Sequence, residues 1–200
     1  MATATDTQRA REKERRREEL LDAADRAVRG LGSDVSMEDV AAEAGITKPV
    51  LYRHFGDKEG LHDALAERYV DELERTLQGA TTGARGRARL EATIYAYLRY
   101  VEHEPERYRF LLQAANRPNG GKLVADFRRR NVESCAFATA ESLRRAGLDP
   151  TLSELWAHSV SGMIRSVGIW WLESRSLPRD QLARHLTAVL WEGLPALRDP

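Results

Sequence analysis

Apolar side chains recur along most of this chain every three or four residues, the spacing that places them on one face of an α-helix. The first such stretch covers residues 8–31 and is ended by Gly30 and Gly32. No segment shows the alternation of apolar and polar positions that is typical of a β-strand. The pattern therefore predicts an all-α fold. The first apolar stripe consists of Leu20, Leu21, Ala24, Ala27, Val28 and Leu31.

The remaining chain continues this pattern, and we expect about nine helices in total. Two short helices lie within 36–55, and longer ones cover 58–77, 87–104, 105–115, 122–146, 152–174 and 178–194. Residues 1–7 have no periodicity and are expected to be disordered, and the glycine-containing segments 78–86 and 116–121 are expected to be loops. The expected domains are residues 1–60 and 61–200, joined by the helix over 58–77.

The two short helices surround a tight turn. Ser36 is suited to cap the first helix, and Gly45 can supply the left-handed residue after its end. Thr47 is expected to cap the second helix. Pro49 then falls in the first turn, where a missing N–H costs little.

The second short helix has an apolar side and an outward side. Its inward residues are Val50, Leu51 and Phe55, and its outward residues are Lys48, Tyr52, Arg53 and His54. A helix that presents hydrogen-bond donors and an aromatic ring, held by a partner helix, fits the major groove of DNA. The alternative is a helical hairpin in an ordinary core, which has no reason to expose these side chains together.

Residues 45–61 resemble the signature of TetR-type transcriptional repressors; they read GITKPVLYRHFGDKEGL. The shared features are the glycine, the Leu-Tyr-x-His-Phe core and a lysine three residues after the phenylalanine. The resemblance implies an N-terminal three-helix domain with a helix-turn-helix that binds DNA. The rest of the chain fits the family's larger helical domain for ligand binding and dimerisation in architecture only.

Four candidate DNA contacts lie at the starts of the two short helices. Ser36 suits a phosphate, because a helix N-terminus attracts anions. Thr47, Lys48 and Pro49 form the leading end of the second helix, which meets base edges. There Lys48 could read guanine O6 and N7, and Pro49 could touch a thymine methyl group.

The resemblance implies further DNA contacts. Tyr52 and His54 match the family's phosphate-contacting tyrosine and histidine, and Lys58 matches its lysine at the start of the fourth helix. Arg53 departs from the aromatic that is commoner at its position, and we assign it a phosphate or guanine contact. An alternative for Tyr52 is a half-buried position against the first helix.

The N-terminal stretch over residues 9–17 is locally basic, with six Lys or Arg against two Glu. Arg15 and Arg16 are our candidates here for contacts with phosphates or the minor groove. The alternative is a solvated helix end, since Glu18, Glu19 and Asp22 follow at pairing distance.

The C-terminal region is rich in aromatic residues, and the resemblance implies a ligand pocket there. The candidate lining is Tyr97, Leu111, Phe127, Asn131, Ser159, Met163 and Val167. Such a lining would take a small, mainly apolar effector. The aromatic residues could instead be core or interface, and Asn131 and Ser159 could be satisfied by their own helices.

The last two helices carry apolar groups on more than one face, whereas a surface helix needs only one apolar stripe. The surplus predicts a homodimer with a four-helix bundle across its two-fold axis. The candidate interface residues are Trp156, Val160, Ile164, Trp171, Leu186, Val189 and Leu190.

Composition adds several bounds. Lys+Arg and Asp+Glu are equal at 31 each, so any basic DNA-binding surface must be local. The single cysteine, Cys135, excludes an intramolecular disulfide and a cysteine-based zinc site. The polar N-terminus is no signal peptide, and no apolar run approaches the roughly 18 residues that span a bilayer. We expect a cytoplasmic protein without a membrane segment.

No enzyme signature is present. The five histidines form neither HxxxH nor HExxH, and the chain contains no GxSxG and no phosphate-binding glycine loop. We therefore predict a DNA-binding regulator, without cofactor or metal, that represses transcription from a palindromic operator and is released by an apolar small molecule. The alternatives are a helical small-molecule-binding protein or enzyme that keeps the hairpin as scaffold, and an activator or nucleoid protein that no ligand releases.

Overall fold

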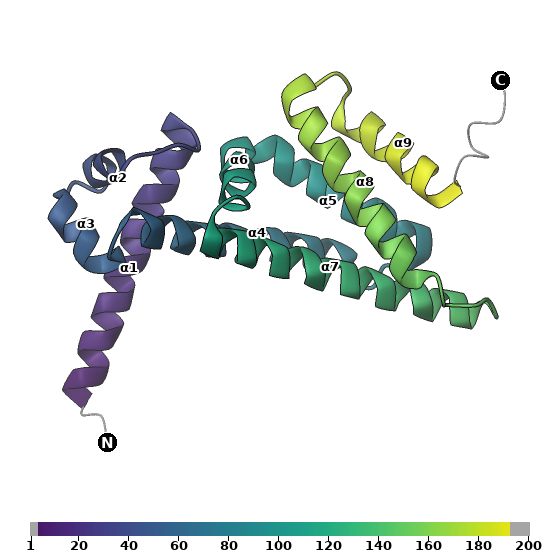
Figure 1. Ribbon diagram of the computed structural model, residues 1–200, viewed down its shortest axis with the longest axis horizontal. Coiled ribbons are helices and arrows are strands. Elements are labelled where there is room, and N and C mark those ends of the chain that lie inside the picture. Colours follow the sequence, from purple (N-terminus) through teal and green to yellow (C-terminus); the bar gives the residue numbers. More distant parts are fainter. Residues whose placement is uncertain (1–3, 193–200) are drawn as a thin grey trace. The chain divides into compact units, whose positions relative to one another are not determined.

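A computed structural model describes residues 4–192, and within that range the chain is all-α (Figure 1). The nine helices described there are α1 (Ala4–Leu31), α2 (Met37–Glu43), α3 (Lys48–Phe55), α4 (Lys58–Thr81), α5 (Gly86–His103), α6 (Pro105–Ala114), α7 (Pro118–Arg145), α8 (Ser153–Ser174) and α9 (Arg179–Glu192). The predicted fold class is confirmed. Within this range, no helix is long and apolar enough to cross a membrane.

Three helices are longer than the sequence predicts. α1 already begins at Ala4, and α4 continues through Gly79 to Thr81, so residues expected to be disordered or in a loop are helical. α7 begins at Pro118 instead of residue 122, because proline suits the first turn of a helix. A Cβ at position 120, in the same turn, would lie 2.8 Å from the carbonyl oxygen of Ala114, so this position requires glycine.

The helices form two compact units. Unit 1 comprises Met1–Tyr69 and Glu106–Leu123, and unit 2 comprises Val70–Pro105 and Val124–Pro200. The units do not follow the expected division after residue 60, because the start of α4 and most of α6 group with the N-terminal helices. The division into functional domains at that residue stays a prediction.

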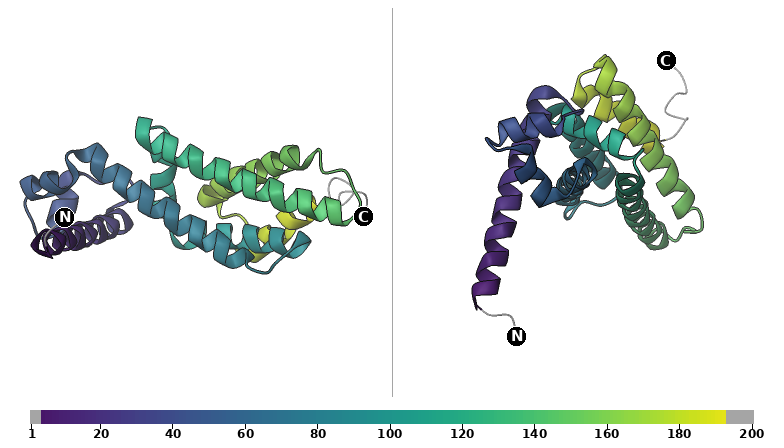
Figure 2. Two further views of the ribbon diagram at one scale, coloured as in Figure 1. Left: turned by 90° about the horizontal axis from the view of Figure 1, so that it is seen from below. Right: turned by 60° about the vertical axis from the view of Figure 1, so that its left-hand side comes forward.

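Unit 1 is built on the C-terminal half of α1. Its predicted stripe is buried from Leu20 to Val28, where α2 packs against it. Leu31 is an exception, since it is 68% exposed and lies in the last turn, beyond the packed part. The prediction for Leu31 is therefore wrong. At its other end α1 runs on past α2 and α3 as a single exposed helix (Figure 2).

A buried polar cluster joins α1, α4 and α6 inside unit 1. Arg107 donates two hydrogen bonds to the Asp25 carboxylate, at 2.7 and 2.6 Å, and the Tyr69 hydroxyl donates to Asp25 at 3.0 Å. The Arg107 guanidinium also lies 5.2 Å from the Tyr69 ring centroid. These contacts offset the free-energy cost of burying the charges of Asp25 and Arg107.

Further polar contacts tie α6 and the residues after it to the connection between α1 and α2. The Ser33 amide donates to Glu106 at 3.2 Å, and Gln113 donates to the Ser33 hydroxyl at 3.1 Å. Arg117, just after α6, contacts Nδ1 of the buried His62 on α4. These contacts hold α6 against the connection between α1 and α2 and against α4.

Unit 2 is organised around α5, which packs against α9 and α8. Tyr97 lies so close to the backbone of Gly168 on α8 that a Cβ at that glycine would come within 3 Å of its ring and hydroxyl. Trp171 is fully buried, and its indole N–H donates to the Leu177 carbonyl at 2.8 Å. The turn into α9 is closed by Arg175, in the left-handed region at φ 42° and 4.4 Å from the Trp171 ring centroid.

Candidate nucleic-acid interface

α2 is fixed in orientation by its N-cap and by its apolar side. Ser36 and Asp39 form a reciprocal capping box, in which the Asp39 amide donates to the Ser36 hydroxyl at 3.2 Å and the Ser36 amide donates to the Asp39 carboxylate at 2.9 Å. The Ser36 hydroxyl also donates to the Asp39 carboxylate at 2.7 Å, and this bond and the one from the Ser36 amide hold the pKa of Asp39 below its usual value. Gly45 follows the helix at φ 64°, as predicted, and lets the chain reverse.

α3 begins at Lys48, with Thr47 before it at the N-cap position and Pro49 after it in the first turn. Thr47 occupies the N-cap position with extended backbone, but its hydroxyl makes no capping hydrogen bond, so the predicted side-chain cap is wrong. Pro49 lies in the first turn, as predicted. Thr47 and Pro49 are exposed, and the Thr47 hydroxyl is therefore available at the leading end of the helix.

The two faces of α3 separate as predicted at four positions, whereas Lys48 and His54, also expected to face outward, are half-buried. Leu51 is fully buried and Phe55 is 9% exposed, whereas Tyr52 is 42% exposed and Arg53 is exposed. Val50 is half-buried. α3 therefore presents a polar and aromatic face to solvent while its core residues hold it to α2, with which it packs.

His54 is half-buried at the C-terminal end of α3. Burial, and then the positive charges of Arg53, Arg16 and Lys13, lower its pKa. Its Nδ1 is buried without a hydrogen-bond partner among residues 4–192. The neutral ring lies in a locally positive environment made by both α3 and α1.

The basic residues of α1 contact acidic residues of the same helix or lie beside α3. Arg15 is ion-paired with Glu12 and Glu19, and Arg16 pairs with Glu19 at 2.8 Å. Arg17 lies 5.3 Å from the Phe55 ring centroid of α3. Arg17 belongs to the surface around α3, as do Arg16 and Lys13, whose charges act on His54. Of these three residues, the sequence singles out only Arg16 as a candidate DNA contact.

The sequence did contain a signal for Lys13 and Arg17 as well. Lys13, Arg17, Leu20 and Leu21 follow one another at helical spacing, and both leucines are buried. A basic residue in register with a buried stripe lies on the side of its helix that faces the neighbouring elements.

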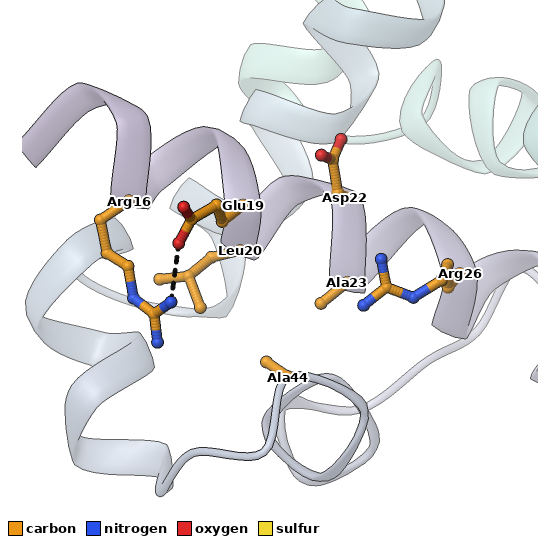
Figure 3. Close-up of a pocket in the computed structure, with 7 residues that line it drawn as sticks. All are labelled: Arg16, Glu19, Leu20, Asp22, Ala23, Arg26 and Ala44. Atoms are coloured by element: carbon orange, nitrogen blue, oxygen red, sulfur yellow. Dashed lines mark hydrogen bonds and ion pairs between the residues drawn. The ribbon is translucent and has the colours of Figure 1, made fainter. Parts of the chain in front are cut away.

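Two shallow grooves lie in unit 1. The first, of about 290 Å³, runs along α1 and ends at Ala44 (Figure 3). Charged residues form its sides, with Arg16 paired to Glu19 above Leu20. The second, of about 330 Å³, lies between the starts of α4 and α7 and includes Asp63 and Asn119, which are hydrogen-bonded at 3.0 Å. Neither groove contains a residue of the expected effector pocket.

The expected effector residues occupy different environments. Tyr97 and Leu111 are buried, and Leu111 belongs to unit 1 whereas the others belong to unit 2. Phe127, Asn131 and Val167 are half-buried, while Ser159 and Met163 are exposed. The amide of Asn131 donates to Phe127 O and the Ser159 hydroxyl to Leu155 O, both at 2.9 Å, so both polar groups are satisfied within their own helices.

The residues expected at the dimer interface also differ in their exposure to solvent. Ile164, Trp171, Leu186 and Leu190 are buried within unit 2 itself and offer no surface to a partner, so these four assignments are corrected. Val160 and Val189 are half-buried, and Trp156 is exposed.

α8 does, however, have a second apolar face. Its exposed large side chains are Leu152, just before the helix, Leu155, Trp156, Met163 and Trp170. From Trp156 on, exposed positions recur every three or four residues through Ser159, Met163 and Ser166 to Trp170. The helix therefore carries one apolar face inside unit 2 and one facing solvent.

A short helix capped and packed against α1, a left-handed glycine, and a second helix with an exposed polar and aromatic face define a helix-turn-helix DNA-binding regulator. Residues 20–65 match the family described as bacterial regulatory proteins, tetR family, and residues 73–200 match the tetracyclin repressor-like C-terminal domain. The chain belongs to the TetR family of transcriptional regulators.

Several relatives cover almost the whole chain. An uncharacterized HTH-type transcriptional regulator of Mycobacterium tuberculosis is 30% identical over 181 residues, which are 90% of this chain and 77% of that protein. The HTH-type transcriptional activator FasR of Mycolicibacterium smegmatis is 28% identical over 186 residues, covering 91% of this chain and 84% of that one. A TetR-like regulator from Rhodococcus sp. RHA1 has a similar structure, with a TM-score of 0.69, 25% identity and coverage of 89% and 94%.

Proposed function

We propose that this regulator binds a palindromic operator as a homodimer, represses transcription from it, and is released by a small, mainly apolar effector. The observation that carries the proposal is the exposed face of α3, where Tyr52 and Arg53 face solvent while Leu51 and Phe55 anchor the helix. Exposed donors and an aromatic ring on a rigidly held helix suit contact with a duplex.

The DNA contacts fall into two groups. Thr47, Lys48 and Pro49 lie at the leading end of α3 and are assigned to base edges. The residues assigned to phosphates are Ser36, Tyr52, Arg53, His54, Lys58, Arg15 and Arg16, and Lys13 and Arg17 join them because of their position beside α3. Contacts to phosphate set the position of the protein and make binding sensitive to salt.

The dimer is proposed to form through the solvent-facing apolar side of α8. Trp156, Met163 and Trp170 follow one face of that helix, and such a face is unfavourable in water unless it is covered. A second copy of the chain supplies the same face, and a two-fold axis pairs identical surfaces. Trp191 of α9, 50% exposed, extends the candidate surface.

The effector is proposed to bind within unit 2, between the half-buried sides of α7 and α8. Phe127 and Val167 are the retained lining residues, because Tyr97 is committed to packing on Gly168. A ligand releases DNA only through its higher affinity for the conformation that binds DNA poorly. α4 is the proposed lever, because it continues as one helix of 24 residues from the end of α3 into unit 2.

The experiment that tests this function is selection of binding sites from a pool of random duplexes with the full-length protein. A two-fold symmetric motif, found again upstream of the protein's own gene, is the expected result. Loss of reporter expression from a promoter carrying the motif would support repression. A gain in expression would instead support activation, the role named for FasR. Failure to enrich any sequence would favour the helical carrier or enzyme.

A further inference from the structure

Two oppositely charged side chains meet at the leading ends of α2 and α3. Glu38 is the second residue of α2, and Lys48 is the first residue of α3. The Glu38 carboxylate and the Lys48 ammonium form an ion pair. Both side chains are largely exposed, at 59% and 43%, so the pair lies on the surface.

This ion pair is not needed to hold α2 in place. The helix is fixed by the capping box of Ser36 and Asp39, and by the buried side chains of Met37, Val40 and Ala41. Exposed ion pairs contribute little to stability, because water already solvates both charges. The position of the pair therefore calls for a reason other than folding.

A carboxylate at this position affects DNA binding in a definite way. The phosphates repel it, so alone it weakens binding to every sequence alike. The ammonium of Lys48, in turn, is a point charge on a flexible stem and can reach any nearby phosphate. Paired with Glu38, the ammonium is held at the leading end of α3, beside the carboxylate.

We propose that Glu38 and Lys48 together read one guanine–cytosine base pair in the major groove. Guanine presents the acceptors N7 and O6, and cytosine presents the N4 amino donor. Lys48 donates to guanine, and Glu38 accepts from the cytosine amino group. At an adenine–thymine pair in the same orientation, thymine O4 replaces the cytosine amino group and the adenine N6 amino group replaces guanine O6. The carboxylate of Glu38 then meets an acceptor and the ammonium of Lys48 meets a donor, and both contacts cost energy.

Glu38 is therefore a specificity-determining residue of the interface. It favours one base pair and keeps Lys48 from a phosphate contact that carries no sequence information. This inference rests on the proposed function, since it assumes that α3 enters the groove.

The test compares full-length wild-type protein with Glu38→Gln, Lys48→Met and the double variant. Binding sites are selected from random duplexes, and affinities for the selected site and its single base-pair changes are measured at several salt concentrations. The control is Glu43→Gln, which removes the same charge from the same helix and breaks the pair of Glu43 with Arg26, 2.7 Å apart. Both glutamates are exposed, so folding is preserved in each case.

In the expected result, wild-type protein prefers guanine–cytosine at one position of each half-site by about tenfold, the scale of one good base contact. Glu38→Gln loses this preference and binds unselected DNA more tightly. Its salt slope steepens by about one, because Lys48 now reaches a phosphate. Lys48→Met loses the preference at the same position, and the double variant loses no more than either single one. Glu43→Gln keeps the wild-type preferences.

Three results overturn the inference. If wild-type protein selects a motif but Glu38→Gln keeps its base preferences and salt slope, the inference fails and the proposed function stands. If Glu38→Gln and Lys48→Met alter different positions, the two side chains do not read one base pair. Enrichment of no sequence by wild-type protein overturns both the inference and the proposed function.

Discussion

Asp25 carries its charge inside unit 1. Burial opposes ionisation, but the hydrogen bonds and charge of Arg107, with the hydrogen bond from Tyr69, outweigh it and hold the pKa of Asp25 below its usual value. A carboxyl group with a lowered pKa stabilises the fold above its unfolded pKa, and this stabilisation is lost as pH falls through the folded pKa. At neutral pH the whole contribution is present.

Asp25→Asn should therefore be strongly destabilising. It leaves the Arg107 guanidinium buried without its counter-charge, which costs about 3–5 kcal/mol. Asp22→Asn is the control, since Asp22 lies on the same helix and pairs with Arg68, but its side chain is exposed. The control should change the free energy of unfolding in urea by only about 0–1 kcal/mol. Equal effects of the two substitutions would show that the cluster is not a buried ion pair in solution.

His62 also makes stability fall as pH is lowered, but over a higher pH range than Asp25. Burial and then the charges of Arg117 and Lys58 lower its pKa to about 4 from 6.5, against the weaker effects of the Val35 backbone and Glu59. Between these two values the unfolded chain binds more protons than the folded one, so stability falls as pH is lowered.

The free energy of unfolding should thus decrease between pH 6.5 and about pH 4, with a slope approaching about 1.4 kcal/mol per pH unit. His62→Gln should remove most of this slope. His103→Gln, at an exposed position, should leave it unchanged. A slope that survives in His62→Gln would assign the pH dependence to other groups.

The sequence predicted apolar residues far better than these charged ones. Helical spacing correctly placed Leu20, Val28 and Leu51 in the core, because periodicity reports which side of a helix faces inward. Asp25 lies beside the same stripe, but its partner Arg107 is 82 residues away in sequence. No local pattern links two such positions, so the cluster could not have been predicted.

At the scale of the elements, the corner between α3 and α4 depends on a glycine. A Cβ at Gly60 would lie 2.1 Å from the carbonyl oxygen of Phe55. The Gly60 amide also donates to the Asp57 carboxylate at 2.7 Å, a bond that caps the start of α4. The clash is with backbone, so it can be relieved only by moving α3 relative to α4.

Gly60→Ala should consequently destabilise the protein by about 1–3 kcal/mol, the usual cost of overpacking, and weaken operator binding beyond this loss. Gly79→Ala is the matched control in the same helix, because nothing lies within 4 Å of its added Cβ. That substitution should be neutral or slightly stabilising, since alanine favours helix. Thermal unfolding and operator affinity measure both effects. Unchanged affinity in folded Gly60→Ala would mean that the corner does not position α3.

Element boundaries show where sequence rules stop. Glycine-containing segments predict loops, yet Gly79, Gly120 and Gly121 lie within α4 and α7. Gly120 is helical and is required by packing, because only a hydrogen atom fits between its Cα and the Ala114 carbonyl. By contrast, Gly45 was predicted correctly because a chain reversal needs a left-handed residue there.

At the scale of the whole molecule, α8 illustrates a similar limit. Its two apolar faces were evident from the sequence, but periodicity cannot tell which face its own chain covers. The structure assigns Ile164 and Trp171 to the inner face and leaves Trp156 and Trp170 outside. The proposed dimer interface changes accordingly.

The combined variant Met163→Glu and Trp170→Glu should produce monomers, because it buries four like charges across a two-fold axis. Its folding should be retained, since both side chains are exposed in the single chain. Leu31→Glu, at an exposed apolar position in unit 1, is the control and should stay dimeric. Sedimentation velocity distinguishes the two species, and a dimeric double variant would move the interface to another surface.

The most direct test of the central claim is a titration of full-length protein onto a fluorescent duplex that carries the selected palindrome. The account predicts a stoichiometry of two chains per duplex and an affinity that falls steeply as salt is raised. Scrambling one half-site should weaken binding at least about tenfold, since half of the base contacts are lost. Equal, salt-insensitive affinity for the palindrome and for its scrambled version would contradict the account.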